Sequence, residues 1–184
     1  MDPTQAPPMA PHLLLLLMGF ATTMAPPANS RTLQATVLSI GDGDSLQVWQ
    51  AGRALKVRLA CIDAPELRQS PWGAQSRSLL QQRLPVGREV KLDVKDIDRH
   101  GRTIAEVTSD INIGLVLVEE GQAFISQRHL HHCKARQYEA AEGSARRRRL
   151  GIWQVSGGIT RPWIFRHRRG HARSILTSTP SSPG

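Results

Sequence analysis

The sequence of this 184-residue chain predicts an α+β fold, mainly β, in which five strands form a small barrel flanked by three α-helices. Two observations predict it. Short runs of β-branched and aliphatic residues are separated by tight turns, and helical patterns follow only the third and fifth of these runs. Residues 31–168 have the size of one domain with one hydrophobic core, and residues 1–30 and 169–184 differ from them in composition.

The first three expected strands follow one another closely. They cover residues 33–40, 45–50 and 54–62. Gly41-Asp42-Gly43-Asp44 and Ala51-Gly52-Arg53 are turn signals between them. Consecutive strands joined by tight turns form a meander, which is how many small barrels begin.

A helix is expected next. Ser70 is a good N-cap and Pro71 suits the first helical position, so the pattern predicts a helix that runs to about Leu84. Pro85 ends it because proline cannot continue the hydrogen-bonding pattern.

The remaining elements complete the barrel. Residues 86–97 and 103–108 are the fourth and fifth expected strands. Asn112 can cap a second helix that ends at Gly121, and residues 135–149 form a third. Five strands with helices after the third and the fifth indicate an OB-like barrel.

The two ends of the chain are expected to lie outside this domain. The apolar run 12–21 has about half the length that a membrane span needs, and Ala28-Asn29-Ser30 favours cleavage before Arg31. We therefore expect residues 1–30 to be a signal peptide of a secreted or periplasmic protein with no stable membrane span after cleavage. An uncleaved anchor and an irrelevant apolar stretch are the alternatives. Residues 169–184 are basic and polar, and we expect them to be disordered.

The net charge of the chain indicates the kind of partner that it binds. Lysine and arginine number 24 against 15 acidic residues, a formal net charge of +9, which predicts affinity for polyanions. A basic protein without a nucleic-acid role is the alternative.

The two cysteines, Cys61 and Cys133, can form one disulfide in an exported protein or remain free thiols.

Three polar clusters carry the candidate chemistry. They are Asp42-Gly43-Asp44-Ser45, the segment 57–66, and Asp98-Arg99-His100-Gly101-Arg102. Each alone is typical of a solvated turn or strand. Together they supply hard oxygen ligands for calcium or magnesium, a glutamate that can act as a base, and arginine forks that bind phosphate. Hydrolysis of a phosphodiester needs all three.

At these residues the chain resembles the staphylococcal nuclease family. The resemblance runs from about Leu33 to Trp153 and rests on Asp-Gly-Asp-Ser, Val-Arg-Leu-x-x-Ile-Asp-Ala-Pro-Glu, Asp-Arg-His-Gly-Arg-Thr-Ile-Ala and Gly-Ile-Trp. It implies an OB-fold barrel with three helices. It also implies calcium-dependent hydrolysis of DNA and RNA that leaves 3′-phosphate and 5′-hydroxyl ends, with low sequence specificity.

The resemblance also implies a calcium site. Asp44 and Asp63 would bind calcium through their carboxylates, and Ala64 would bind it through its backbone carbonyl. Asp42 is expected to form the turn or to lie in the outer shell.

The resemblance to the family also implies catalytic roles for three residues of this chain. Glu66 would activate water, while Arg58 and Arg102 would grip the scissile phosphate. Arg58 and Asp63 are an odd number of positions apart, so in a regular strand they would face opposite sides. The resemblance therefore implies a bend between them.

The residues expected to contact the rest of the nucleic acid differ from those that are common in the family. Its members commonly place tyrosines on the nucleotide after the Gly-x-Ala segment, and this chain has none there. Arg128 and His129 are candidates to replace them, together with Arg99 and His100 of the third cluster. The alternative function is a non-catalytic OB-fold protein that binds single strands. We expect a monomer.

Overall fold

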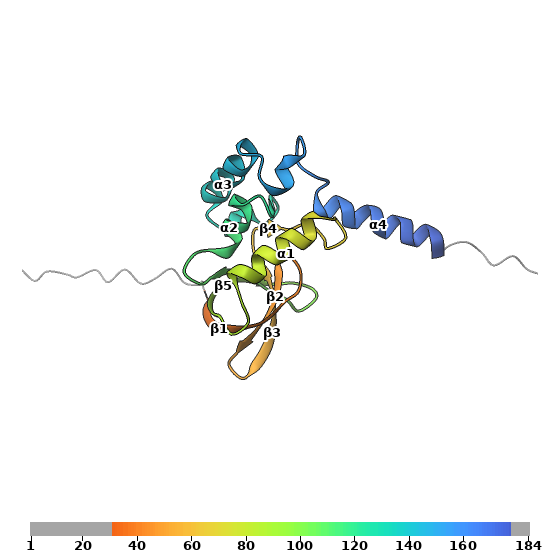
Figure 1. Ribbon diagram of the computed structural model, residues 1–184. Coiled ribbons are helices and arrows are strands. Elements are labelled where there is room, and N and C mark those ends of the chain that lie inside the picture. Colours follow the sequence, from red (N-terminus) through yellow and green to blue (C-terminus); the bar gives the residue numbers. More distant parts are fainter. Residues whose placement is uncertain (1–30, 178–184) are drawn as a thin grey trace, which may run out of the picture.

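The computed structural model describes residues 31–177, so the expected signal peptide lies outside the described residues. Figure 1 shows a barrel with α1 lying across it and with α2 and α3 packed together at one end, while α4 projects away from the rest of the domain. Within residues 31–177, no helix combines the length and apolarity needed to span a membrane.

The barrel has the five predicted strands. They are β1 (Arg31–Ile40), β2 (Ser45–Gln50), β3 (Arg53–Leu59), β5 (Glu89–Ile97) and β6 (Thr103–Thr108). Their order is β1-β2-β3-β6-β5, and β5 pairs again with β1 to close the barrel. All neighbours are antiparallel except β3 and β6, which run parallel. The predicted mainly β, OB-like fold is confirmed.

Alternating apolar residues explain why these segments form a closed barrel. Leu46 and Val48 of β2 point inward and are buried, as are Ala105 and Val107 of β6. The polar residues between them are more exposed, which is the period-two pattern of a sheet with one buried face. The fourth strand begins at Glu89 instead of residue 86, because Gly87 (φ +85°) forms a turn after Pro85.

Two short strands sit beside the barrel. β4 (Ile62–Asp63) pairs with β7 (Phe124–Ile125). Between β3 and β4 the chain turns at Cys61, whose φ of +65° lies in the left-handed region. This turn is the bend that the spacing of Arg58 and Asp63 requires.

The described part of the chain, residues 31–177, contains four α-helices where three were expected. They are α1 (Trp72–Arg83), α2 (Ile113–Glu119), α3 (Ala135–Arg147) and α4 (Pro162–Thr177), with short 3₁₀ turns at Leu130–His132 and Gly151–Gln154. The predicted cap of α2 is confirmed, since the Asn112 side chain accepts the Leu115 backbone N–H at 3.1 Å.

The predicted cap of α1 is wrong. Ser70 makes no capping hydrogen bond, and the Ser70–Pro71 peptide bond is cis. Backbone carbonyls accept the N–H groups at the start of the helix instead. Gln69 O accepts the Gly73 N–H at 3.1 Å, and Pro71 O accepts the Gln75 N–H at 3.1 Å. The helix therefore begins without a side-chain cap.

The predicted disordered tail also differs from the structure. Its boundary at residue 169 falls inside α4, which continues to Thr177. Composition suggested disorder because the segment is basic and polar. However, arginine is a good helix former, and Pro162 suits a helix start.

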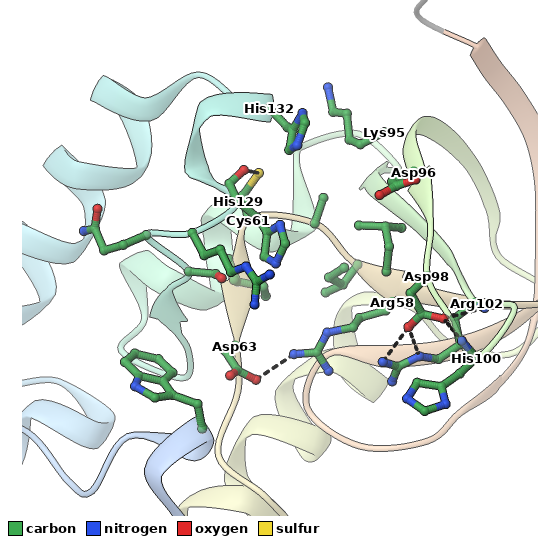
Figure 2. Close-up of a pocket in the computed structure, with 18 of the residues that line it drawn as sticks. Arg58, Cys61, Asp63, Lys95, Asp96, Asp98, His100, Arg102, His129 and His132 are labelled. Atoms are coloured by element: carbon green, nitrogen blue, oxygen red, sulfur yellow. Dashed lines mark hydrogen bonds and ion pairs between the residues drawn. The ribbon is translucent and has the colours of Figure 1, made fainter. Parts of the chain in front are cut away.

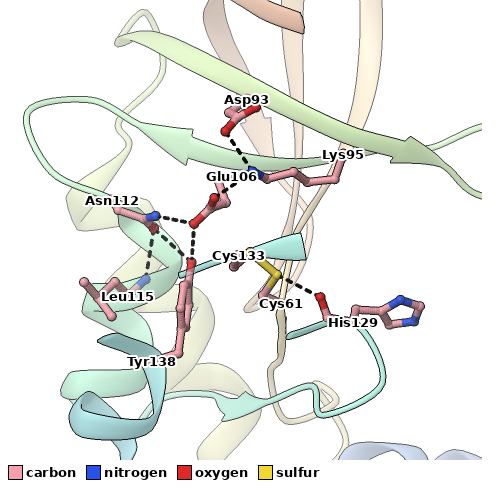
Figure 3. Close-up of a disulfide and its surroundings, with 9 residues drawn as sticks. All are labelled: Cys61, Asp93, Lys95, Glu106, Asn112, Leu115, His129, Cys133 and Tyr138. Carbon is pink, nitrogen blue, oxygen red and sulfur yellow. Dashed lines mark hydrogen bonds and ion pairs between the residues drawn. A yellow bond between two sulfur atoms is a disulfide. The ribbon is translucent and has the colours of Figure 1, made fainter. Parts of the chain in front are cut away.

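A disulfide joins Cys61 to Cys133, the first of the two alternatives for these cysteines. It links the turn after β3 to the residue that follows the 3₁₀ turn Leu130–His132, two positions before α3, as Figure 3 shows. Nearby, the Glu106 carboxylate accepts the Tyr138 hydroxyl at 2.9 Å and the Asn112 amide at 2.7 Å, and pairs with Lys95 at 3.0 Å. This network attaches both helices α2 and α3 to the barrel.

Reduction should destabilise the domain strongly. The disulfide closes a loop of 72 residues. Loop-closure entropy for that length predicts that reduction lowers the free energy of unfolding by about 4 kcal/mol. Denaturant unfolding with and without dithiothreitol measures the difference. A Cys61→Ser/Cys133→Ser variant is the control, because it should be as unstable as the reduced protein and should not respond to reductant. Equal stability of oxidised and reduced protein would contradict the prediction.

Candidate active site

A cavity of about 860 Å³ opens beside the barrel. Its walls come from β3, the β5–β6 hairpin, the segment 126–132 and α4. Figure 2 shows Arg58 pointing toward Asp63, with Arg102 and His100 on one side of the cavity and His129 on another. The lining is rich in charged side chains, among them Arg58, Asp63, Glu66, Arg102, Arg128 and Arg166.

Arg58 connects the two predicted calcium ligands. Its Nη1 bonds to Asp44 Oδ1 at 2.8 Å and its Nη2 bonds to Asp63 Oδ1 at 2.6 Å. Ser45 and Arg58 are register partners, so β2–β3 pairing puts Asp44 beside the strand position of Arg58. The turn at Cys61 then returns Asp63 to the same side. The structure thus brings these three residues into direct contact.

Asp44 lies beneath Arg58 and does not line the cavity. It is 2% exposed, and its Oδ2 accepts the backbone N–H of Ala64 at 2.7 Å. Burial raises the pKa of Asp44 to about 7, opposed by Arg58 and reinforced by the nearby charges of Asp42 and Asp63. The pKa of Arg58 is also raised, because the two carboxylates outweigh the effect of its burial.

Asp42 shapes the turn that presents Asp44. Its Oδ1 accepts the Asp44 backbone N–H at 3.1 Å and the Ser45 hydroxyl at 2.6 Å. Burial acts to raise the pKa of Asp42, but these hydrogen bonds and Arg58 lower it below its ordinary value. Asp42 therefore has the turn-forming role expected of it.

Arg102 is held by its own hairpin. Asp98 Oδ2 accepts from Arg102 Nε at 2.7 Å, and Asp98 Oδ1 accepts the backbone N–H groups of His100 and Arg102. Burial works in the opposite direction, yet these hydrogen bonds lower the pKa of Asp98 to about 2. Arg102 lines the same cavity as Arg58, but its ion pair is with Asp98 and not with the carboxylates around Arg58.

The four predicted nucleic-acid contacts all line the cavity. Arg99 and His100 are exposed at the tip of the hairpin, where Arg99 Nε donates to His100 Nε2 at 3.2 Å. Arg128 and His129 come from the opposite segment, which the disulfide at Cys133 tethers. Burial, with the neighbouring charge of Arg128, lowers the pKa of His129.

Two of the lining residues come from α4, and neither was predicted. Arg166 bonds to both carboxylate oxygens of Asp63, and Trp163 contributes an aromatic surface that is 42% exposed. Neither belongs to a recognisable motif. An available signal was that an arginine-rich segment with tryptophan and phenylalanine follows the last motif but still lies inside the predicted domain 31–168.

The donor chemistry of the site fits a hard divalent cation. Among residues 31–177, no group of three or more His, Cys, Asp or Glu side chains gathers to hold a metal. Asp44 and Asp63 are nevertheless close enough to share one guanidinium, which makes them a partial set of oxygen donors. Water and phosphate oxygens would have to complete the roughly six to eight ligands that calcium takes.

Comparison with known proteins shows the family to which the chain belongs. The family described as staphylococcal nuclease homologue matches residues 56–155. A micrococcal nuclease of Shigella flexneri is 34% identical over 146 residues, covering 74% of this chain and 82% of the relative. Protein ParB of Escherichia coli is 31% identical, covering 77% and 83%, and an uncharacterized endonuclease of Haemophilus influenzae is 35% identical, covering 67% of each.

An OB-like barrel with arginines and carboxylates around one cavity defines a class of proteins that act on phosphodiesters. The chain belongs to the staphylococcal nuclease family. It is therefore a nuclease, and its substrates are nucleic acids.

Replacing Arg58 with lysine should impair hydrolysis although it keeps the charge. Arg58 uses two separate nitrogens for Asp44 and Asp63, and a single ammonium cannot reproduce that fork. We expect Arg58→Lys to lower kcat by about a hundred- to a thousandfold, the usual effect of losing a preorganised donor. Steady-state kinetics on DNA measure it. The exposed Lys56→Arg is a matched control on the same strand and should keep wild-type kinetics. A near wild-type kcat for Arg58→Lys would show that catalysis does not need the two guanidinium nitrogens of Arg58.

Proposed function

We propose that this protein is a calcium-dependent nuclease that hydrolyses DNA and RNA with low sequence specificity and leaves 3′-phosphate and 5′-hydroxyl ends. The observation that carries the proposal is the shared contact of Asp44 and Asp63 with Arg58, at a cavity that also contains Glu66 and Arg102. The residues expected to bind a cation and those expected to bind phosphate are therefore adjacent.

Each side chain has a distinct task in this proposal. Glu66 is 33% exposed in its side chain, so water can reach its carboxylate, which accepts the proton of the attacking water. Arg58 and Arg102 donate to the phosphate oxygens and stabilise the charge that develops on them. Asp98 keeps Arg102 oriented through its hydrogen bond at 2.7 Å.

A cation would be held by Asp44, Asp63 and the carbonyl of Ala64. Calcium bound there would supply positive charge that polarises the phosphate and lowers the pKa of a bound water. Few protein donors are available, so we expect weak binding without nucleic acid.

Low sequence specificity is supported by the character of the lining. Arginines dominate it, and arginine contacts to phosphate position a nucleic acid without distinguishing its bases. The net charge of +9 acts in the same direction, and activity should fall as salt concentration rises.

A hydrolysis assay tests the function directly. We expect the wild-type protein to cleave single- and double-stranded DNA and RNA with calcium and to be inactive with chelator. Glu66→Gln should bind DNA normally but cleave it on the order of a hundredfold more slowly, since general-base catalysis contributes about that much. Product ends are identified by mass spectrometry.

The controls separate the roles. Glu119→Gln removes an exposed acid that does not line the cavity and should behave as wild type. DNA binding without hydrolysis under any condition would favour the single-strand-binding alternative. Equal loss of binding and cleavage in Glu66→Gln would indicate a structural role for Glu66.

We also propose that the mature protein is exported and acts as a monomer. The Cys61–Cys133 disulfide supports export, because such bonds persist in oxidising compartments. Cell fractionation with N-terminal sequencing should locate a protein that begins near Arg31 outside the cytoplasm, and light scattering should give the monomer mass. A cytoplasmic protein that keeps its first thirty residues would contradict export.

A further inference from the structure

One arginine from α4 occupies the carboxylates of the site. Arg166 Nη2 bonds to Asp63 Oδ2 at 2.7 Å, and its Nη1 bonds to Asp63 Oδ1 at 3.1 Å and to Glu66 Oε1 at 2.6 Å. These oxygens belong to a proposed cation ligand and to the proposed base. The Asp63 carboxylate has both oxygens engaged in this way, and Arg58 shares one of them.

The start of α4 is docked on the domain by several independent contacts. The Gln69 side chain donates to Thr160 O at 2.8 Å. The guanidinium of Arg161 lies 4.1 Å from the ring centre of Phe124 and 5.0 Å from that of Trp153. Trp163 then meets Phe124 edge-on, with ring centroids 6.2 Å apart. Arg166 lies three positions after Trp163, on the same face of the helix, so the docked segment carries it to the cavity.

A guanidinium and a directly coordinated cation cannot occupy the same carboxylate oxygens. Arg166 contributes an aligned pair of hydrogen bonds to a carboxylate whose side chain is only 7% exposed, an arrangement much stronger than an ordinary surface ion pair. Arg58 contacts only Asp63 Oδ1, so Arg166 must leave Asp63 Oδ2 before a cation can bind that oxygen.

We propose that Arg166 is a further functional residue of the active site, which acts as an internal counter-ion: it binds Asp63 and Glu66 in the cation-free enzyme and thereby sets the affinity for the divalent cation. This inference rests on the proposed calcium dependence. Arg166 lies beyond residue 155, where the family match ends, so the device belongs to the C-terminal helix and not to the matched region.

The charge balance explains why such a counter-ion is useful. Asp44, Asp63 and Glu66 supply three carboxylates, and Arg58 contacts only two of them. Arg166 contacts Glu66 and supplies a second positive charge to Asp63. The carboxylates therefore keep a partner until a cation binds.

Calcium titration calorimetry without nucleic acid tests the proposal. Wild type is compared with Arg166→Gln, which keeps a polar side chain but is shorter and loses the charge and the fork. The matched control is Arg168→Gln, which removes the same charge from an exposed position of the same helix. If Arg166 occupies the carboxylates for about nine-tenths of the time, its loss should tighten calcium binding by about tenfold. Arg168→Gln should stay within about twofold of wild type, as an exposed charge has only a weak effect.

Thermal unfolding provides a second readout that does not depend on catalysis. In chelator, Arg166→Gln should unfold at a lower temperature than wild type because the carboxylates lose their partner. At saturating calcium this difference should disappear. A decrease of the same size in both conditions would show that Arg166 is a structural residue only, and would overturn the proposal.

The outcomes also distinguish this proposal from the proposed function. Equal calcium affinity in Arg166→Gln and Arg168→Gln, while hydrolysis still requires calcium, would overturn the counter-ion role alone. If no variant binds calcium and hydrolysis does not need it, the calcium-dependent function fails as well. Measurable calcium binding in Arg166→Gln but not in wild type would support the proposal.

Discussion

The active site depends on one guanidinium between two buried carboxylates. Asp44 and Asp63 would repel each other in a place that excludes water, and Arg58 is the cation that both of them contact. This arrangement exists because the chain turns sharply at Cys61, immediately after β3 ends. The strand positions Arg58 against Asp44, and the turn returns Asp63 to the same guanidinium. A straight strand would have separated the pair.

Segments far apart in the sequence form the rest of the site, and different interactions fix each of them. The β5–β6 hairpin carries Arg102 and is ordered internally by Asp98. The segment with Arg128 has little regular structure and is tethered by the disulfide at Cys133. The start of α4 is docked on aromatic rings. The barrel thus positions the side chains proposed to bind a cation and phosphate, while less regular segments carry the side chains proposed to contact the remainder of the substrate.

Local patterns in the sequence were sufficient to predict most of the barrel. Alternating apolar residues and turn glycines identified its five strands, and the Asn112 cap followed from side-chain chemistry alone. The cap expected at Ser70 failed because neighbouring backbone carbonyls satisfy the helix start, which residue type cannot reveal. The contact of Arg166 with Asp63 joins residues 103 positions apart. Such a contact depends on tertiary docking, so no local pattern predicts it.

The closed barrel has a consequence for the behaviour of the folded protein at high concentration. Because β1 pairs with both β2 and β5, every strand of the barrel has a neighbour on each side. Unpaired strand edges are the usual templates for joining one chain to another. The strands outside the barrel, β4 and β7, are two residues each, too short to recruit a foreign strand effectively. The architecture that orients the arginines therefore also protects the folded domain from edge-to-edge aggregation.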